Sequence, residues 1–129
     1  MNSDLQQKLF EKYPKIFKNA NETSLYFSIE CDDGWYMLID KLCYFLQSRI
    51  DNNNHPQITA LQVKETFGLL RFYTSGESNF QEGAIRFAEV ISSSICEKCG
   101  STNDVSETGA SYIKYYCKGC RGNKKIFRR

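Results

Sequence analysis

The chain has 129 residues and a formal net charge of +2, which allows one compact domain, or one small domain with an appended metal module, and excludes two equal domains. Its 8 Tyr and 9 Phe argue against an intrinsically disordered protein. No apolar run reaches the length that a bilayer requires and no secretory-type segment opens the sequence, so we expect a cytosolic protein.

The positive charge is concentrated at the end of the chain. Residues 1–95 carry 9 Lys and Arg against 12 Asp and Glu (net −3), whereas residues 96–129 carry 8 against 3 (net +5). A basic segment suits an anionic partner such as nucleic acid, but so few charges attract only weakly, and a solubilising tail is the simpler interpretation. The cations that would follow a phosphate backbone are Lys114, Lys118, Arg121, Lys124, Lys125, Arg128 and Arg129.

The first part of the chain predicts one short helix followed by one strand. A capping-box pattern at residues 3–6 begins the helix, and Pro14 ends it. Residues 19–23 are polar and should form a loop. Residues 24–31 alternate between apolar and polar side chains, as a half-buried strand does.

The main core helix is expected over residues 35–49, because apolar side chains recur there at helical spacing. Asp33 stands where the cap of this helix is needed. Residues 58–67 and 69–74 then read as two strands joined by a tight turn.

A last helix begins at a second capping box, residues 78–81. It leads into Cys96 with no linker, so the segment after it should be fixed against the body of the domain. Its apolar stripe comprises Phe80, Ala84, Phe87, Ala88, Ile91 and Ile95.

The strongest chemical signal is a pair of C-x-x-C motifs separated by a polar insert, formed by Cys96, Cys99, Cys117 and Cys120. Their spacing is that of a zinc ribbon, in which four thiolates complete a closed tetrahedral shell around a structural Zn²⁺. Disulfides, a redox dithiol and an iron site are the alternatives. A redox C-x-x-C is expected after a strand and at the start of a helix, whereas Cys96 follows a predicted helix. We therefore predict structural zinc.

These elements predict an α+β fold, with a small antiparallel sheet that packs helices on one face and a C-terminal zinc ribbon. Residues 1–95 would form the α+β domain, and residues 96–129 the ribbon with its basic tail. Alternation places Leu61 and Val63 on the face toward the helices. Glu65 falls on the same apolar side, so it either lies at the strand end or is buried with a partner.

The opposite, open face of the sheet gathers cations, a carboxylate and tyrosines. It could hold an anionic, ring-bearing ligand, with Lys64 and Arg71 on phosphate and a tyrosine stacked on a base. Cross-strand ion pairing on a solvated sheet is the competing and more ordinary interpretation. The candidate ligand-binding residues are Tyr26, Glu30, Lys64, Arg71 and Tyr73.

No catalytic constellation is recognisable, so we do not expect an enzyme. Asp51 with Gln62 and Lys64 matches the metal-binding strand of restriction-type nucleases only poorly, because Asp51 ends a predicted helix and Gln62 carries no charge. His55, the only histidine, lies beside a proline in a polar loop.

Several segments in combination carry a resemblance: Leu9–Phe17, Glu30–Trp35, Gln62–Tyr73, and Ala88–Glu89 leading to Cys96–Gly100. With them, most of the chain resembles a family of small, uncharacterised proteins encoded by phages and prophages, which end in a four-cysteine zinc ribbon. The resemblance implies a phage setting in the host cytosol, where such proteins commonly act on host machinery or host defence. It implies no catalytic residue.

The residues and the resemblance together lead us to expect a non-enzymatic, zinc-containing protein that binds a host protein. Sequestration of a nucleotide-like ligand on the open sheet face is one alternative. Nucleic-acid binding through the basic ribbon is the other.

Overall fold

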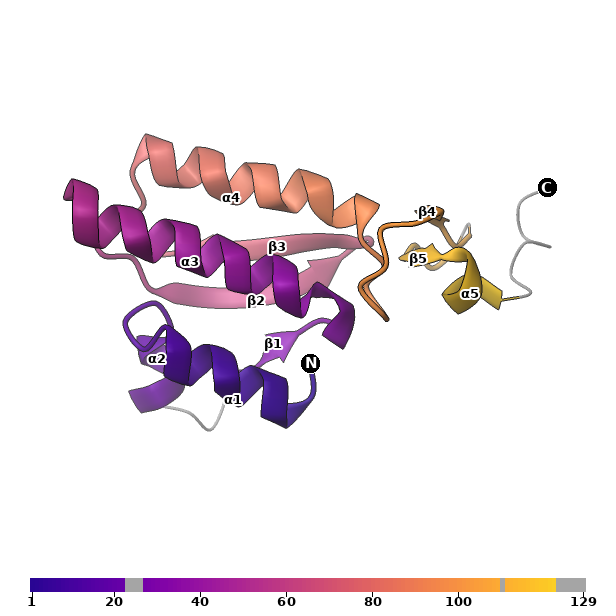
Figure 1. The fold of residues 1–129 in the computed structure, drawn as a ribbon, viewed down its shortest axis with the longest axis horizontal. Coiled ribbons are helices and arrows are strands. Elements are labelled where there is room, and N and C mark those ends of the chain that lie inside the picture. Colours follow the sequence, from indigo (N-terminus) through magenta and orange to yellow (C-terminus); the bar gives the residue numbers. More distant parts are fainter. Residues whose placement is uncertain (23–26, 110, 123–129) are drawn as a thin grey trace.

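A three-stranded sheet with helices on one face, and a small cysteine-rich module at one end, make up the computed structural model (Figure 1). The structure describes residues 1–22, 27–109 and 111–122. Within them no helix has the length and apolar character needed to span a bilayer. The architecture is the predicted α+β class. Its elements are α1 (Ser3–Lys12), α2 (Lys18–Glu22), β1 (Ile29–Glu30), a 3₁₀ turn (Asp33–Trp35), α3 (Tyr36–Asn53), β2 (Ala60–Thr66), β3 (Leu69–Thr74), α4 (Asn79–Ile91), a second 3₁₀ turn (Ser92–Ser94), β4 (Val105–Glu107), β5 (Tyr115–Cys117) and α5 (Lys118–Arg121).

The main sheet has the strand order β1-β2-β3 and is mixed rather than wholly antiparallel. β2 and β3 form the predicted antiparallel hairpin. β1 pairs with β2 in parallel, because α3 carries the chain back between them, as a parallel connection requires. β1 is also shorter than predicted: of the expected strand 24–31 only two residues pair, while residues 23–26 lie outside the described part of the chain.

The helices cover one face of this sheet, where Val63, Leu70 and Phe72 are buried. Leu61 was predicted on this face, and that prediction is wrong: its side chain is 54% exposed. The pairing of β2 with β3 shifts register between Ala60 and Gln62, so Ala60 points into the core in place of its neighbour. The alternation of apolar and polar residues in the sequence does not reveal a bulge of this kind.

The hairpin turn consists of Phe67 and Gly68, as expected, and both have positive φ values of 53° and 85°. Such a two-residue turn matches the twist of the strands that it joins. A Cβ on Gly68 would lie only 2.9 Å from the ring of Tyr115, so the turn packs closely against the cysteine-rich module. Phe67 itself remains exposed.

The helix starts differ from prediction in the first half of the chain. Asn2, not Ser3, caps α1, and its side chain accepts a hydrogen bond from the Leu5 N–H at 2.9 Å. Asp33 does not cap α3: its carboxylate accepts from the backbone and the side chain of Asn2 at 2.7 and 2.9 Å. In the second half, the predicted capping box of α4, Ser78 with Gln81, is present.

Helix is present at two places where none was predicted. Residues 18–22 form α2 rather than a loop, and its Ala20 is buried. α3 continues to Asn53, four residues past the expected end, and closes on Asn54 in the left-handed conformation. Asparagine tolerates that conformation well, which explains why the helix ends there.

A carboxylate on α3 links this helix to α1 by hydrogen bonds, and no sequence pattern predicted this role. Asp40 is buried on α3 and accepts hydrogen bonds from Lys12 Nζ at 2.9 Å and the Tyr13 hydroxyl at 2.7 Å. Burial alone would raise the pKa of Asp40, but these two donors outweigh it and lower the pKa below its ordinary value.

Candidate metal centre

The four predicted ligands lie together in the structure. The sulfur atoms of Cys96, Cys99, Cys117 and Cys120 are all within 4.8 Å of one another, and all six cysteines of the chain are free thiols. Cys99 Sγ and Cys117 Sγ are 3.6 Å apart, too far for a disulfide bond. Zn–S bonds of about 2.3 Å in a tetrahedron place sulfur atoms about 3.8 Å apart. The cluster therefore fits a tetrahedral ion and can hold a metal.

The first cysteine pair is shaped by backbone hydrogen bonds immediately after the second 3₁₀ turn. The Gly100 N–H donates to Cys96 O at 2.8 Å, and the Cys96 N–H donates to Ser101 O at 2.8 Å. Gly100 has a φ of 85°, a conformation that glycine adopts without strain. These bonds turn the chain back on itself, so that Cys96 and Cys99 point to the same side.

The second pair is held by the β4–β5 hairpin and α5. Cys117 ends β5, opposite Val105, and the next residue begins α5. The Glu97 N–H donates to Tyr115 O at 3.1 Å and thereby joins the two cysteine turns. Cys120 lies on α5 in reach of Cys117. The backbone N–H of Cys120 lowers the pKa of Cys117 to about 7, which favours the thiolate that a metal requires.

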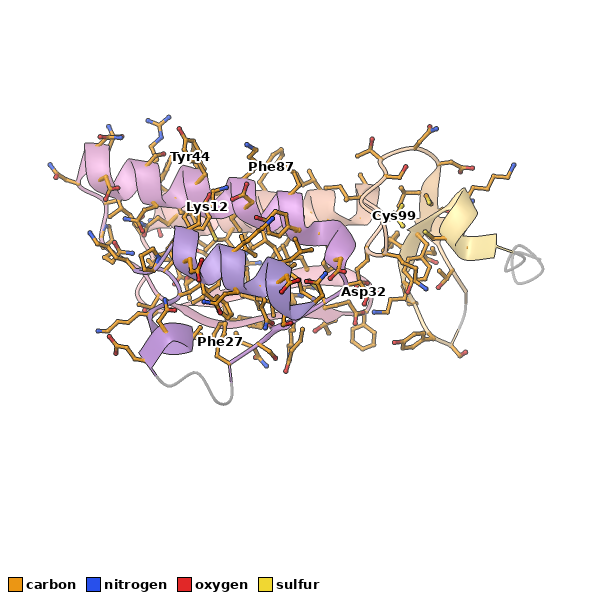
Figure 2. The ribbon with its side chains drawn as sticks, turned by 60° about the horizontal axis from the view of Figure 1, so that its bottom comes forward. Lys12, Phe27, Asp32, Tyr44, Phe87 and Cys99 are labelled. Atoms are coloured by element: carbon orange, nitrogen blue, oxygen red, sulfur yellow. The ribbon has the colours of Figure 1, made fainter. Side chains whose placement is uncertain are left out.

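Residues of the domain body donate hydrogen bonds to backbone carbonyl groups at the first cysteine turn. The Gly34 N–H donates to Glu97 O at 2.7 Å, and Trp35, fully buried, donates from Nε1 to Ile95 O at 3.1 Å. A Cβ on Gly34 would overlap the carbonyl oxygens of Cys96 and Glu97. The module is thus fixed against the domain, as the missing linker predicted, and Figure 2 shows Asp32 on the side of the body that faces Cys99.

A buried charge network lies behind the metal site. Lys114 Nζ is 3.2 Å from Glu97 Oε1 and 3.1 Å from Glu65 Oε1. Glu97 also accepts from the Asp32 N–H at 3.0 Å, and Glu65 accepts from the Gly68 N–H at 2.7 Å. The network joins both cysteine turns to the β2–β3 hairpin and to the start of the first 3₁₀ turn.

Glu65 was expected either at the end of its strand or buried with a partner. It lies near the end of β2 and forms an ion pair with Lys114. Burial raises the pKa of Glu97, against the opposing effect of the Asp32 N–H and Lys114. Burial would lower the pKa of Lys114, but its two carboxylate partners outweigh this and raise it above its ordinary value. The ammonium group therefore stays charged between its two partners.

The candidate ligand-binding residues of the sheet are only partly brought together. Glu30 pairs in register with Lys64, and Lys64 with Arg71, so the three share the open face. Glu30 and Tyr73 line one shallow hollow of about 360 Å³, which neither Lys64 nor Arg71 lines. Tyr26 lies outside the described residues.

Arg71 is drawn to the edge of the sheet by a residue of α4. Its Nη1 is 3.5 Å from Glu89 Oε1, while Glu89 Oε2 accepts from the Phe72 N–H at 3.0 Å. Ser92 Oγ accepts from the Leu70 N–H at 3.0 Å. Side chains thus accept hydrogen bonds from two backbone N–H groups on the outer edge of β3. These bonds protect an edge that would otherwise pair with another strand.

Two of the three candidate cations that are described in the module have structural roles. Lys114 is buried in the charge network, and Arg121 is buried and donates to Asp104 O at 2.9 Å and Tyr116 O at 2.8 Å. Lys118 is exposed. The remaining four candidates, Lys124, Lys125, Arg128 and Arg129, lie outside the described residues.

The sequence predicted the four thiols but neither the burial of Glu97 nor its ion pair with Lys114, a residue that was expected among the phosphate-facing cations. Glu97 stands between the cysteines of the first motif, where an exposed polar residue is the ordinary expectation, and nothing in its spacing marks it as buried. Comparisons with protein-family models, with curated proteins and with solved structures find no match to this chain.

Proposed function

We propose that the protein is a non-enzymatic binding protein whose fold is stabilised by one structural Zn²⁺, and that it acts on a host protein in a phage or prophage setting. The observation that carries the metal part is the cluster of four sulfur atoms within 4.8 Å. All four positions of a tetrahedral ion would be thiolates from the chain itself. Such an ion has no open position for substrate or water, so it supports structure rather than catalysis.

Protein binding is supported by the apolar surface that α3 and α4 leave exposed. Met37, Tyr44, Phe87 and Val90 are each more than half exposed. Scattered apolar side chains are ordinary on a protein surface, but α3 and α4 also enclose an apolar groove that Phe45, Phe80 and Phe87 line, and such a groove supports an interaction site. The phage setting and the host partner rest on the resemblance of the sequence alone.

The two alternatives find less support. A phosphate on the sheet face would have to compete for Arg71 with Glu89, which already holds it at 3.5 Å. Nucleic-acid binding by the module would depend on Lys118 and the terminal cations, because Lys114 and Arg121 are buried and engaged. A gel-shift titration at two salt concentrations and calorimetry with linear and cyclic nucleotides test these alternatives, and we expect no tight binding in either.

Native mass spectrometry and elemental analysis test the metal assignment. We expect one zinc per chain under reducing conditions, retained in Cys31→Ala and lost from stoichiometric level in Cys99→Ser and Cys120→Ser. Cys31 is the matched control, because it is a buried thiol outside the cluster. Absence of metal from the wild type, or disulfides among the four cysteines, would contradict the proposal and the cytosolic assignment with it.

A further inference from the structure

An apolar face runs along the outer side of α3 and α4, which lie side by side over the sheet (Figure 1). Figure 2 shows Tyr44 of α3 and Phe87 of α4 along the same outer edge of the molecule. Six of its side chains are large, apolar and exposed: Met37, Tyr44, Phe45, Phe80, Phe87 and Val90. The sequence placed Phe80 and Phe87 on one helical stripe, and the structure leaves both of them open to solvent.

A groove of about 650 Å³ lies between the two helices on this face. Leu38, Leu42 and Phe45 form its α3 wall, and Phe80 and Phe87 lie on its α4 wall. At 1.5 Å per residue, the 13 residues of α4 make the face about 20 Å long. That length accommodates about three to four turns of a partner helix.

The exposed apolar area is large enough for a specific interface. With about 200 Å² for each aromatic side chain, the six residues expose roughly 600 Å². Half of these residues, Phe45, Phe80 and Phe87, line the groove itself, and the total approaches the about 800 Å² that one partner contributes to a standard interface.

Gly83 is an independent sign that the groove is kept open. It lies exposed in the middle of α4, where glycine stabilises a helix less than alanine does. Beyond its own turn of helix, no atom of the described residues lies within 4 Å of the position that its Cβ would occupy, so the fold itself does not require glycine there. Its absent side chain leaves the backbone of α4 bare beside the groove, where a partner can approach closely.

The charges around the groove indicate the chemistry of its occupant. Lys41 lines the groove, and Arg49 lies over the ring of Phe45, 5.2 Å from its centre. No carboxylate is among the described residues that line the groove. An acidic partner therefore complements the α3 side, whereas a second copy of this chain would bring the same cations.

We propose that this groove binds an amphipathic α-helix of another protein, with apolar residues at positions i, i+4 and i+7 and carboxylates on the flank that meets Lys41 and Arg49. The inference rests on the proposed function of protein binding and names the surface and the kind of partner. The apolar residues of the helix occupy the groove beside Gly83. The carboxylates pair with the two cations of α3 and fix its direction.

A display library of helix-forming peptides, randomised on one face and on both flanks, is the probe. Selection on the wild type should enrich peptides with the stated apolar spacing and with Glu or Asp on one flank. Gly83→Leu fills the groove from an open position without changing the core, and we expect it to weaken the enriched peptides at least tenfold. Tyr112→Ser, which removes an exposed aromatic side chain from the metal module, should leave the peptide affinity unchanged.

A charge exchange tests the direction of the helix. Lys41→Glu should weaken the enriched peptides at least fivefold, and a peptide with Lys in place of the facing carboxylate should regain affinity for that variant. Circular dichroism and zinc content of each variant establish that it is folded and loaded with metal.

The experiments distinguish a wrong proposal about the groove from a wrong proposed function. Enriched peptides that bind Gly83→Leu as well as the wild type would overturn the groove but leave protein binding elsewhere. A wild-type dimer that Gly83→Leu makes monomeric would identify a second copy as the occupant and overturn the helix proposal. A library without any enriched helical peptide would also overturn it. A preparation without zinc would contradict the proposed function and not the groove.

Discussion

Replacing Gly34 by alanine is expected to destabilise the protein by more than about 3 kcal/mol and to weaken its hold on the metal. The added Cβ would overlap the carbonyl oxygens of Cys96 and Glu97 and lie 2.6 Å from Glu97 C. All three are backbone atoms of the first cysteine turn, so no flexible side chain can move aside. The turn must shift, and the hydrogen bond from the Gly34 N–H to Glu97 O is strained or lost.

Urea unfolding of the zinc-loaded protein measures the stability change, and competition with a colorimetric chelator measures the metal affinity. Gly119→Ala is the matched control, because no atom of the described residues outside its own helical turn lies within 4 Å of the Cβ added there, although Gly119 also lies in a C-x-x-C motif. We expect this control to stay within about 1 kcal/mol of the wild type. Equal behaviour of the two variants would mean that the module does not dock on Gly34 as described.

Replacing Lys114 by methionine is expected to cost about 3 to 5 kcal/mol, because it leaves the Glu97 carboxylate buried without a counter-charge. Glu97 is fully buried, and its only cation among the described residues is Lys114, at 3.2 Å. Glu65 would lose the same partner but is partly exposed, so solvent limits its share of the loss.

Adding Glu97→Gln to Lys114→Met should recover part of the lost stability. The amide removes the unpaired charge, while its carbonyl oxygen can still accept from the Asp32 N–H, which donates to Glu97 in the wild type. Lys118→Met removes an exposed lysine from the same module and should change the free energy of unfolding by less than about 0.5 kcal/mol. If Lys114→Met were as mild as Lys118→Met, the buried network would be energetically unimportant.

The parts of the fold that the sequence predicted well are those with a local signal. The spacing of the cysteines identified all four candidate ligands, and the capping box at Ser78 located the start of α4. Helical and alternating apolar patterns identified α3 and the β2–β3 hairpin. In each case the residues that carry the pattern are neighbours along the chain, so short-range rules suffice.

Some predictions missed the ends of helices by a few residues, but the larger failures depend on contacts between distant segments. The bulge that turns Leu61 outward and the parallel pairing of β1 are set by how strands meet across the sheet. Likewise, Glu97 and Lys114 are 17 residues apart and become partners only when the two cysteine turns close on each other. Such pairings leave no periodic pattern in the sequence, so they are not predicted from it.

The most direct test of the account is hydrogen exchange of the protein before and after complete removal of its metal by a chelator. The metal module is tied to the body through the Gly34 N–H and the Asp32 N–H, which donate to the backbone and the side chain of Glu97. We expect these two amides to lose their protection together with residues 96–109 and 111–121 when the metal is removed. Unchanged protection of Asp32 and Gly34 in the metal-free protein would contradict it.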